Sequence, residues 1–211
     1  MITITKDRRI LPIIPTRGNH EHSSILFNKV FLTPGGPDNY YLTQIGSFYC
    51  ITLNTEISMG GHQKKWLKET LQSISPHAQW ILANYHRPAW PSVKFPSGAK
   101  NHWVPLFDQF FLDFVYESDG HTLKVTVPIL HDQVDHKKGV IYLGEGGLGV
   151  KQRYPFKKWS WYFKSPGFTR KAHHIMMLTV SESVLMNQVV SDAGQILHTL
   201  KRPPKKHLRM P

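Results

Sequence analysis

Three short polar clusters in this 211-residue sequence hold side chains that could together bind a metal ion. The first is Gly18-Asn19-His20-Glu21, the second centres on His86, and the third pairs Asp119 with His121 across a glycine. Mn, Fe and Zn accept amide oxygens, carboxylates and imidazoles as ligands. The chain has 13 histidines, so a single histidine indicates little, and the hypothesis of a metal site depends on the three clusters together.

Each cluster follows an apolar run that predicts a short buried strand. These runs lie at residues 10–14, 79–84 and 113–116. In α/β sheets, ligands bind at the carboxyl ends of the strands. We therefore expect the three clusters to meet at one edge of a sheet.

The remaining pattern predicts alternating strands and helices, followed by strands alone. Two adjacent strands are predicted at 39–45 and 47–53, and apolar residues at helical spacing predict a helix between Gly60 and Pro76. A second helix is predicted at 102–111, and strands dominate from residue 122 onward. This order predicts an α/β core with added antiparallel strands.

The order of the motifs resembles that of calcineurin-like metallophosphoesterases, and most of all their purple acid phosphatase-like branch. The motifs are Gly18-Asn19-His20-Glu21, then His86-Arg87-Pro88, then Asp119-Gly120-His121. Further stretches that fit the family are 51–56, 61–67, 80–89, 140–147 and 189–194. The resemblance covers roughly residues 10–200 and implies a β-sandwich flanked by helices, with α/β/β/α layers.

The resemblance implies hydrolysis of phosphoesters at a centre of two metal ions, drawn from Fe, Mn or Zn, where a metal-bound hydroxide attacks phosphorus. Asn19, His86 and Asp119 would bind the second metal, and His121 would bind the first. Asp119 stands where the family more often has a histidine, and its carboxylate adds negative charge. His20 would face the leaving-group oxygen as a proton donor or as a stabiliser of the transition state.

Two arginines neighbour these expected ligands. Arg17 and Arg87 could bind the phosphate oxygens of a phosphoester substrate, or they could be ordinary charged residues of the surface. Glu21 is expected to fix its own loop as a hydrogen-bond acceptor rather than to bind metal.

Two motifs of the family are missing from this sequence. The family pattern begins with Asp-x-His and Gly-Asp, but the only acidic residue before Gly18 is Asp7, and no Asp-x-His occurs. The sequence thus resembles an N-terminally truncated domain whose missing segment would supply the bridging carboxylate. We therefore expect the chain alone to be a poor phosphatase, and the alternative is a non-catalytic remnant of the fold that binds an anionic partner.

The net charge of +12 and the pI near 9.8 favour anionic partners. Cationic and aromatic residues alternate in the segment 151–171. This segment could stack on nucleic-acid bases, or it could be a solvated loop whose aromatic side chains are buried in the core. The order of the motifs argues against a nucleic-acid partner. The domain is predicted at 1–200, followed by a basic, disordered tail at 201–211.

No apolar run approaches the ~18 residues that cross a bilayer, so no membrane span is predicted. No signal peptide opens the sequence, and although related proteins are often exported, the sequence assigns no compartment. The single cysteine, Cys50, lies in a predicted buried strand and is expected to fill the core.

Overall fold

The computed structural model describes residues 6–8, 12–21 and 24–209. Its central feature is a seven-stranded sheet in the order β1-β2-β3-β4-β8-β5-β9. Strands β2, β3, β4 and β8 are parallel, and β1, β5 and β9 pair antiparallel with their neighbours. The strands are β1 (Tyr41–Ile45), β2 (Phe48–Thr52), β3 (Trp80–Tyr85), β4 (Phe114–Glu117), β5 (Leu123–Val125), β8 (Ile141–Gly144) and β9 (Phe168–Arg170).

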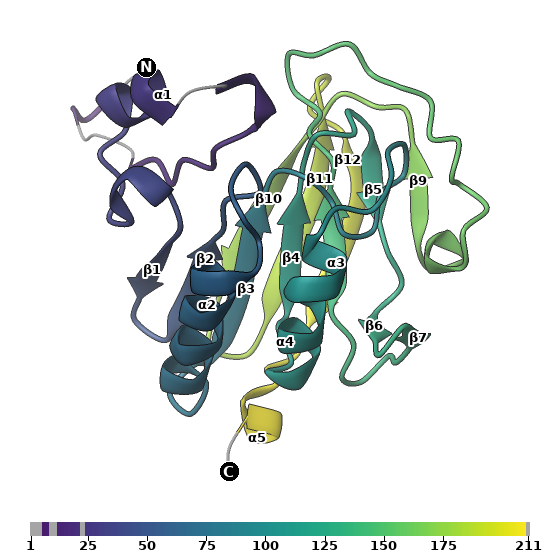
Figure 1. Ribbon diagram of the computed structural model, residues 1–211. Helices are drawn as coiled ribbons and strands as arrows, with labels where there is room; N and C mark the ends of the chain where they lie inside the picture. The colour runs from purple at the N-terminus through teal and green to yellow at the C-terminus, as the bar shows by residue number, and fades with distance from the viewer. Residues whose placement is uncertain (1–5, 9–11, 22–23, 210–211) are drawn as a thin grey trace.

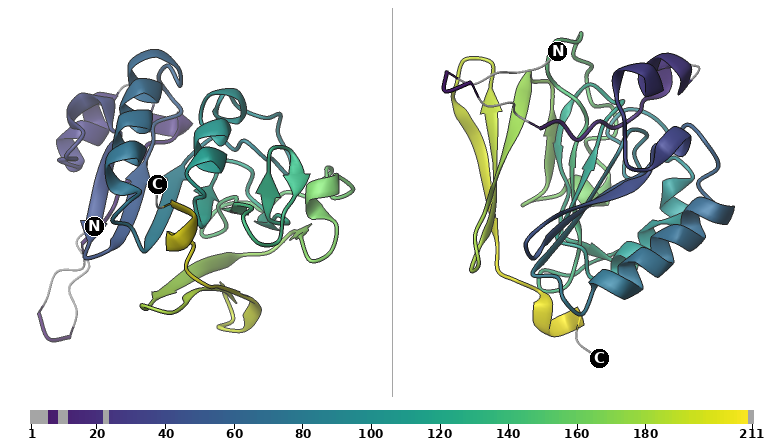
Figure 2. Two further views of the ribbon diagram at one scale, coloured as in Figure 1. Left: turned by 90° about the horizontal axis from the view of Figure 1, so that it is seen from below. Right: turned by 90° about the vertical axis from the view of Figure 1, so that its left-hand side faces the viewer.

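A second, three-stranded sheet packs on one face of the central sheet (Figure 2). It is the antiparallel meander of β10 (His174–Val180), β11 (Leu185–Ser191) and β12 (Ile196–Arg202). Alternate residues of the two sheets point toward each other and form an apolar core layer. That layer contains Trp80, Leu82, Phe114, Val125, Ile141, Leu143 and Leu185, with Met176, Leu178 and Leu200 packed against it.

Helices cover the other face of the central sheet (Figure 1). They are α2 (Gly61–Ile74), α3 (Ala99–His102) and α4 (Val104–Gln109). The buried residues of α2 are Gln63, Leu67, Leu71 and Ile74, which recur at helical spacing and place one stripe against the sheet. The helix predicted at 102–111 is the shorter α4, with Pro105 in its first turn, where proline is well tolerated, and α3 ends separately at His102.

The predicted α/β architecture is confirmed, as a helical layer, a mixed sheet and a second sheet. In the part of the chain that the structure describes, Figure 2 shows no helix over the outer face of the three-stranded sheet, so the second helical layer of the α/β/β/α expectation is not seen there. Residues 12–14 of the strand predicted at 10–14 are irregular, and residues 10 and 11 lie outside the described ranges. No helix in those ranges is long and apolar enough to cross a membrane.

The smaller elements lie in the connections between these layers. They are η1 (Asn19–Glu21), α1 (Ser24–Val30), η2 (Gly36–Asp38), β6 (Ile129–Leu130), β7 (Gln133–Val134), η3 (Trp161–Phe163) and α5 (Lys206–Arg209). Cys50 is buried in β2, as predicted, and burial raises the pKa of its thiol to about 12.

The basic C-terminal segment differs from its prediction. Residues 201–209 are ordered rather than a disordered tail, because strand β12 continues to Arg202 and α5 follows. The buried ammonium of Lys205 donates to three backbone carbonyls at 2.7 to 3.0 Å. Arg209 Nη2 lies 2.7 Å from Asp113 Oδ2, with both side chains buried. The cations of this segment thus satisfy acceptors at the lower end of the sheet, which composition alone could not show.

Candidate metal centre

The parallel strands β2, β3, β4 and β8 end at the same edge of the central sheet, and three of the expected ligands, His86, Asp119 and His121, follow the ends of β3 and β4. His86 comes directly after β3, and Asp119 lies two residues after β4. Asn19 comes from elsewhere in the chain, on the short helix η1. The topology of the sheet therefore brings His86 and Asp119 to one edge, and the loop that carries Asn19 meets His86 there.

Asn19, His86 and Asp119 meet at one imidazole nitrogen. His86 Nε2 lies 2.7 Å from Asn19 Oδ1 and 3.4 Å from Asp119 Oδ1. The His86 side chain is 19% exposed and that of Asp119 is 5% exposed, so the cluster is largely removed from solvent. An amide oxygen, an imidazole and a carboxylate are ligand types that Mn, Fe and Zn ions accept.

Lys94 is a fourth member of this cluster that the sequence did not indicate. Its Nζ lies 2.5 Å from Asp119 Oδ1. Burial alone would raise the pKa of the Asp119 carboxyl, but the hydrogen bonds from His86 and Lys94 outweigh it and hold that pKa well below its usual range. Lys94 lies in the long loop between β3 and α3, where no motif marks it.

Glu21 and Gly18 fix the loop that brings Asn19 to the cluster. The backbone N–H of Gly18 donates to Glu21 Oε2 at 2.6 Å, which confirms Glu21 as a loop-fixing acceptor. A Cβ at Gly18 would lie 3.0 Å from the His86 ring, tighter than ordinary packing permits. The loop can approach His86 because residue 18 has no side chain.

Arg17 and Arg87 line a hollow of about 320 Å³ together with Asn19 and Glu56. Arg17 is buried, whereas the Arg87 side chain is 42% exposed. Glu56 accepts a two-pronged hydrogen bond from Arg87, with Nε at 2.8 Å and Nη2 at 2.7 Å. The hydrogen bonds that Arg87 donates to Glu56 raise the pKa of Arg87, and that carboxylate already offsets its charge.

The two remaining expected residues point elsewhere. His20 is exposed and lines an apolar hollow of about 620 Å³ with Phe27 and Val30. His121 Nδ1 lies 3.2 Å from the carbonyl oxygen of Lys151. Burial lowers the pKa of His121, and the nearby positive charge of Arg153 lowers it further. Within the described ranges, no hydrogen bond or ion pair joins His121 to the side chains of the cluster.

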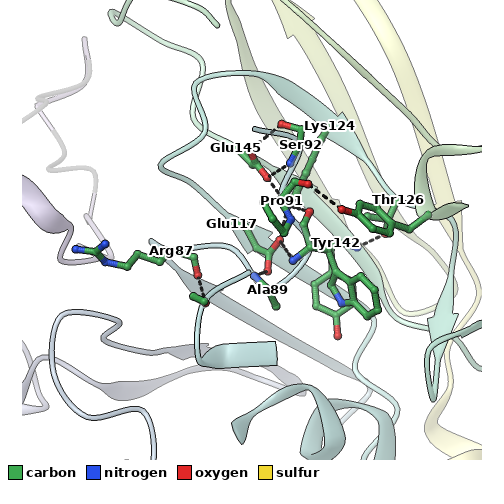
Figure 3. Close-up of polar contacts among 12 residues, drawn as sticks. Arg87, Ala89, Pro91, Ser92, Glu117, Lys124, Thr126, Tyr142 and Glu145 are labelled. Atoms are coloured by element: carbon green, nitrogen blue, oxygen red, sulfur yellow. Dashed lines mark hydrogen bonds and ion pairs between the residues drawn. The ribbon is translucent and has the colours of Figure 1, made fainter. Parts of the chain in front are cut away.

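A buried network of charges joins β4, β5 and the residue that follows β8 (Figure 3). The Lys124 ammonium pairs with Glu117 and lies 2.9 Å from Glu145 Oε1, and all three side chains are 0% exposed. The Tyr85 hydroxyl donates to Glu117 Oε1 at 2.6 Å. Burial would lower the pKa of Lys124, but the two carboxylates dominate and raise it.

This network holds the loop that carries Arg87 and Lys94. The backbone N–H of Ala89 donates to Glu117 Oε1 at 2.6 Å, and that of Ser92 donates to Glu145 Oε1 at 2.8 Å (Figure 3). Lys124 Nζ also donates to the Trp90 carbonyl at 2.7 Å. The path of the loop is therefore fixed by side chains from β4, from β5 and from the residue that follows β8.

Gly120 joins the candidate centre to the buried network. It lies between Asp119 and His121, both of which have a positive φ, at 71° and 57°. A Cβ at Gly120 would collide with the carboxylate of Glu145. Only glycine fits at this turn while Glu145 keeps its place.

No family model matches the sequence. Two uncharacterized proteins of Mycobacterium tuberculosis are 25% identical to it over 202 residues. The similarity covers 70% of this chain and 37% of each relative, so the chain spans little more than a third of the length of these curated relatives.

Solved structures share the fold at low sequence identity. A purple acid phosphatase from yellow lupin seeds, PPD1, superposes with a TM-score of 0.64 at 18% identity, over 79% of this chain and 33% of its own. GAP50, described as the anchor in the inner membrane complex of Plasmodium, gives 0.58 at 16% identity, over 83% and 61%. PhoD gives 0.53 at 16% identity, over 81% and 42%. The chain has a metallophosphoesterase-like fold.

Proposed function

We propose that this chain carries a metal-dependent phosphoesterase site in which Asn19, His86 and Asp119 bind one cation. The observation that carries the proposal is their convergence, with His86 Nε2 at 2.7 Å from Asn19 and 3.4 Å from Asp119. No group of three or more His, Cys, Asp or Glu side chains in the described ranges could hold a metal ion. The amide oxygen of Asn19 is therefore an essential metal ligand in this proposal.

The residues around the cluster have separate roles in the proposed reaction. A bound cation would supply Lewis acidity toward the phosphoryl group and an activated water. Arg17 and Arg87 would orient phosphate oxygens in the hollow that they line with Asn19. His20, the neighbour of Asn19, would have to turn away from the apolar hollow that it lines in order to donate a proton to the leaving group. The substrate class is a phosphoester.

The proposal concerns a single cation. A two-metal centre would need His121 to turn away from the Lys151 carbonyl, which its Nδ1 faces at 3.2 Å. A pair of cations would also need an anion between them to offset their repulsion.

Cation binding by the 211-residue chain tests the proposal directly. After removal of metal with a chelator, we expect isothermal titration with Mn²⁺ or Zn²⁺ to show one site, and His86→Ala to weaken it by about tenfold or more. The matched control is His77→Ala, because His77 is exposed in the turn between α2 and β3, at the opposite end of β3 from His86. Equal binding by the wild type and His86→Ala would contradict the proposal, and aryl-phosphate hydrolysis measured with the same variants would show whether binding supports turnover.

One observation favours a second candidate function, a non-catalytic site for an anion. Lys94 Nζ already lies 2.5 Å from Asp119 Oδ1, so an ammonium group pairs with the carboxylate that would otherwise bind a metal ion. In this alternative, Lys94 and Arg17 would bind an anionic group without any metal. Absence of cation binding in both the wild type and Lys94→Met, together with loss of inorganic phosphate binding in Lys94→Met, would favour this alternative.

A further inference from the structure

One long segment of the chain combines positive charge with exposed apolar side chains. Residues 146–181 contain no Asp or Glu, although they form more than a sixth of the chain. In Figure 1 this segment runs as a long loop from β8 along the edge of the molecule to η3 and β9. Its cations are Lys151, Arg153, Lys157, Lys158, Lys164, Arg170 and Lys171.

The aromatic residues of this segment fall into two groups. Tyr162 and Phe163 are buried, as expected for side chains rooted in the core. Tyr154, Phe156 and Trp159 instead are 76%, 65% and 82% exposed, so the prediction of a loop with aromatic side chains in the core is wrong for them. Large apolar side chains that are exposed close together in the sequence are typical of an interaction surface.

Contacts join this segment to a neighbouring loop and extend the surface. Phe95, which follows Lys94, is 86% exposed, and Lys157 Nζ lies 5.0 Å from the centre of its ring. The backbone N–H of Lys157 donates to the Ser92 carbonyl at 3.1 Å, which fixes the two loops side by side. We call this the interfacial surface, which comprises Phe95, Leu148, Val150, Tyr154, Phe156 and Trp159 with the cations of 151–171.

The side chains of the interfacial surface alternate between cations and apolar groups. Lys158 Nζ lies 5.0 Å from the centre of the Trp159 ring, and Lys171 Nζ lies 4.7 Å from that of Tyr154. Long cationic side chains that lie beside aromatic rings can keep their charges at a lipid headgroup while the rings enter the acyl boundary. We propose that the interfacial surface docks this protein onto the surface of an anionic lipid bilayer.

The composition of the surface favours a bilayer over single-stranded nucleic acid. Base stacking uses aromatic faces, but Leu148 is 67% exposed and Val150 is 37% exposed in the same segment. Aliphatic side chains gain by entering a lipid phase and have no comparable role on a base. The absence of acidic side chains over 146–181 matches the negative potential of an anionic leaflet.

Docking would also orient the candidate centre. Lys94 adjoins Phe95 in sequence, and the backbone N–H of Arg153 donates to the His121 carbonyl at 2.9 Å. The interfacial surface therefore adjoins the edge of the sheet that carries Asp119. A docked chain would have this edge close to the headgroups.

Vesicle co-sedimentation of the 211-residue chain tests the proposal, with phosphatidylcholine vesicles prepared with and without phosphatidylserine. We expect binding to the anionic vesicles, and at least about a tenfold weaker partition for a variant with Phe95→Ala, Phe156→Ala and Trp159→Ala, since the burial of each ring in lipid is lost. This variant keeps the net charge of +12. Its matched control is Ile25→Ala with Leu32→Ala, because these apolar side chains are 63% and 94% exposed outside the interfacial surface.

The outcomes separate this proposal from simple attraction between charges. Equal binding of the triple variant and the wild type would show adsorption by net charge alone and would overturn the proposal. Binding to oligo-dT that the triple variant loses, without binding to either kind of vesicle, would overturn it in favour of nucleic acid. All substituted side chains are exposed, so thermal unfolding of both variants should match that of the wild type and show that the fold is intact.

Discussion

Lys124 and Lys94 both meet carboxylates near the ends of neighbouring strands, but in opposite surroundings. The Lys124 ammonium has acceptors from Glu117, Glu145 and the Trp90 carbonyl, and its side chain is 0% exposed. The Lys94 side chain is 34% exposed, and within the described ranges its ammonium has Asp119 as its hydrogen-bond partner. A buried lysine whose three N–H groups all have acceptors stabilises the fold. A partly exposed lysine with a single acceptor can exchange that acceptor for water.

The difference also explains why the two carboxylate groups would respond differently to a metal ion. A cation could reach Asp119 by displacing Lys94 into solvent, where the ammonium is readily hydrated. No such exchange is open to Lys124, because its removal would leave the charges of Glu117 and Glu145 buried without a cation. The buried network is therefore expected to be structural, and the candidate centre exchangeable.

The largest expected effect comes from breaking the buried network. Lys124→Met should lower the free energy of unfolding by about 3–5 kcal/mol, since it leaves two buried carboxylates unpaired. Urea denaturation followed by circular dichroism measures this loss. The control is Lys68→Met on the exposed face of α2, and a similar small change in both variants would contradict the structural role.

A smaller change in stability, together with a gain in binding, is expected at Lys94. Lys94→Met should change the free energy of unfolding by less than about 1 kcal/mol, because the pair that it breaks is partly exposed. The affinity for Mn²⁺ should rise, since the competing ammonium is gone. Titration calorimetry and urea denaturation of this one variant measure both quantities, and a loss of stability as large as that of Lys124→Met would remove the contrast between the two lysines.

The smallest effect concerns solvent exclusion within the central sheet. Cys50 is buried in β2, and burial raises the pKa of its thiol to about 12. At pH 8 the thiol is therefore protonated and covered, so a thiol-reactive dye should label the native chain much more slowly than the chain in denaturant. Rapid labelling of the native chain would show that this sheet opens more readily than its packing indicates.

The sequence could predict the ends of the strands better than the contacts made beyond them. Apolar runs located β3 and β4, and the ends of those strands placed His86 and Asp119 at one edge. Lys94 could not be found in this way, because it lies in an irregular loop and meets Asp119 across 25 residues of sequence. Lys124 was also hidden, because a lysine within a strand is typical of a solvated position until two carboxylates assemble around it.

Gly120 and Glu145 share one small space, and this has a consequence for how the sequence can vary among descendants of this protein. Any side chain at position 120 would occupy the volume of the Glu145 carboxylate. A larger residue at 120 could therefore be inherited only with a shorter one at 145, and that change would in turn leave Lys124 without one of its acceptors. We expect positions 120, 124 and 145 to covary, so that the turn carrying Asp119 evolves together with the interior beneath it.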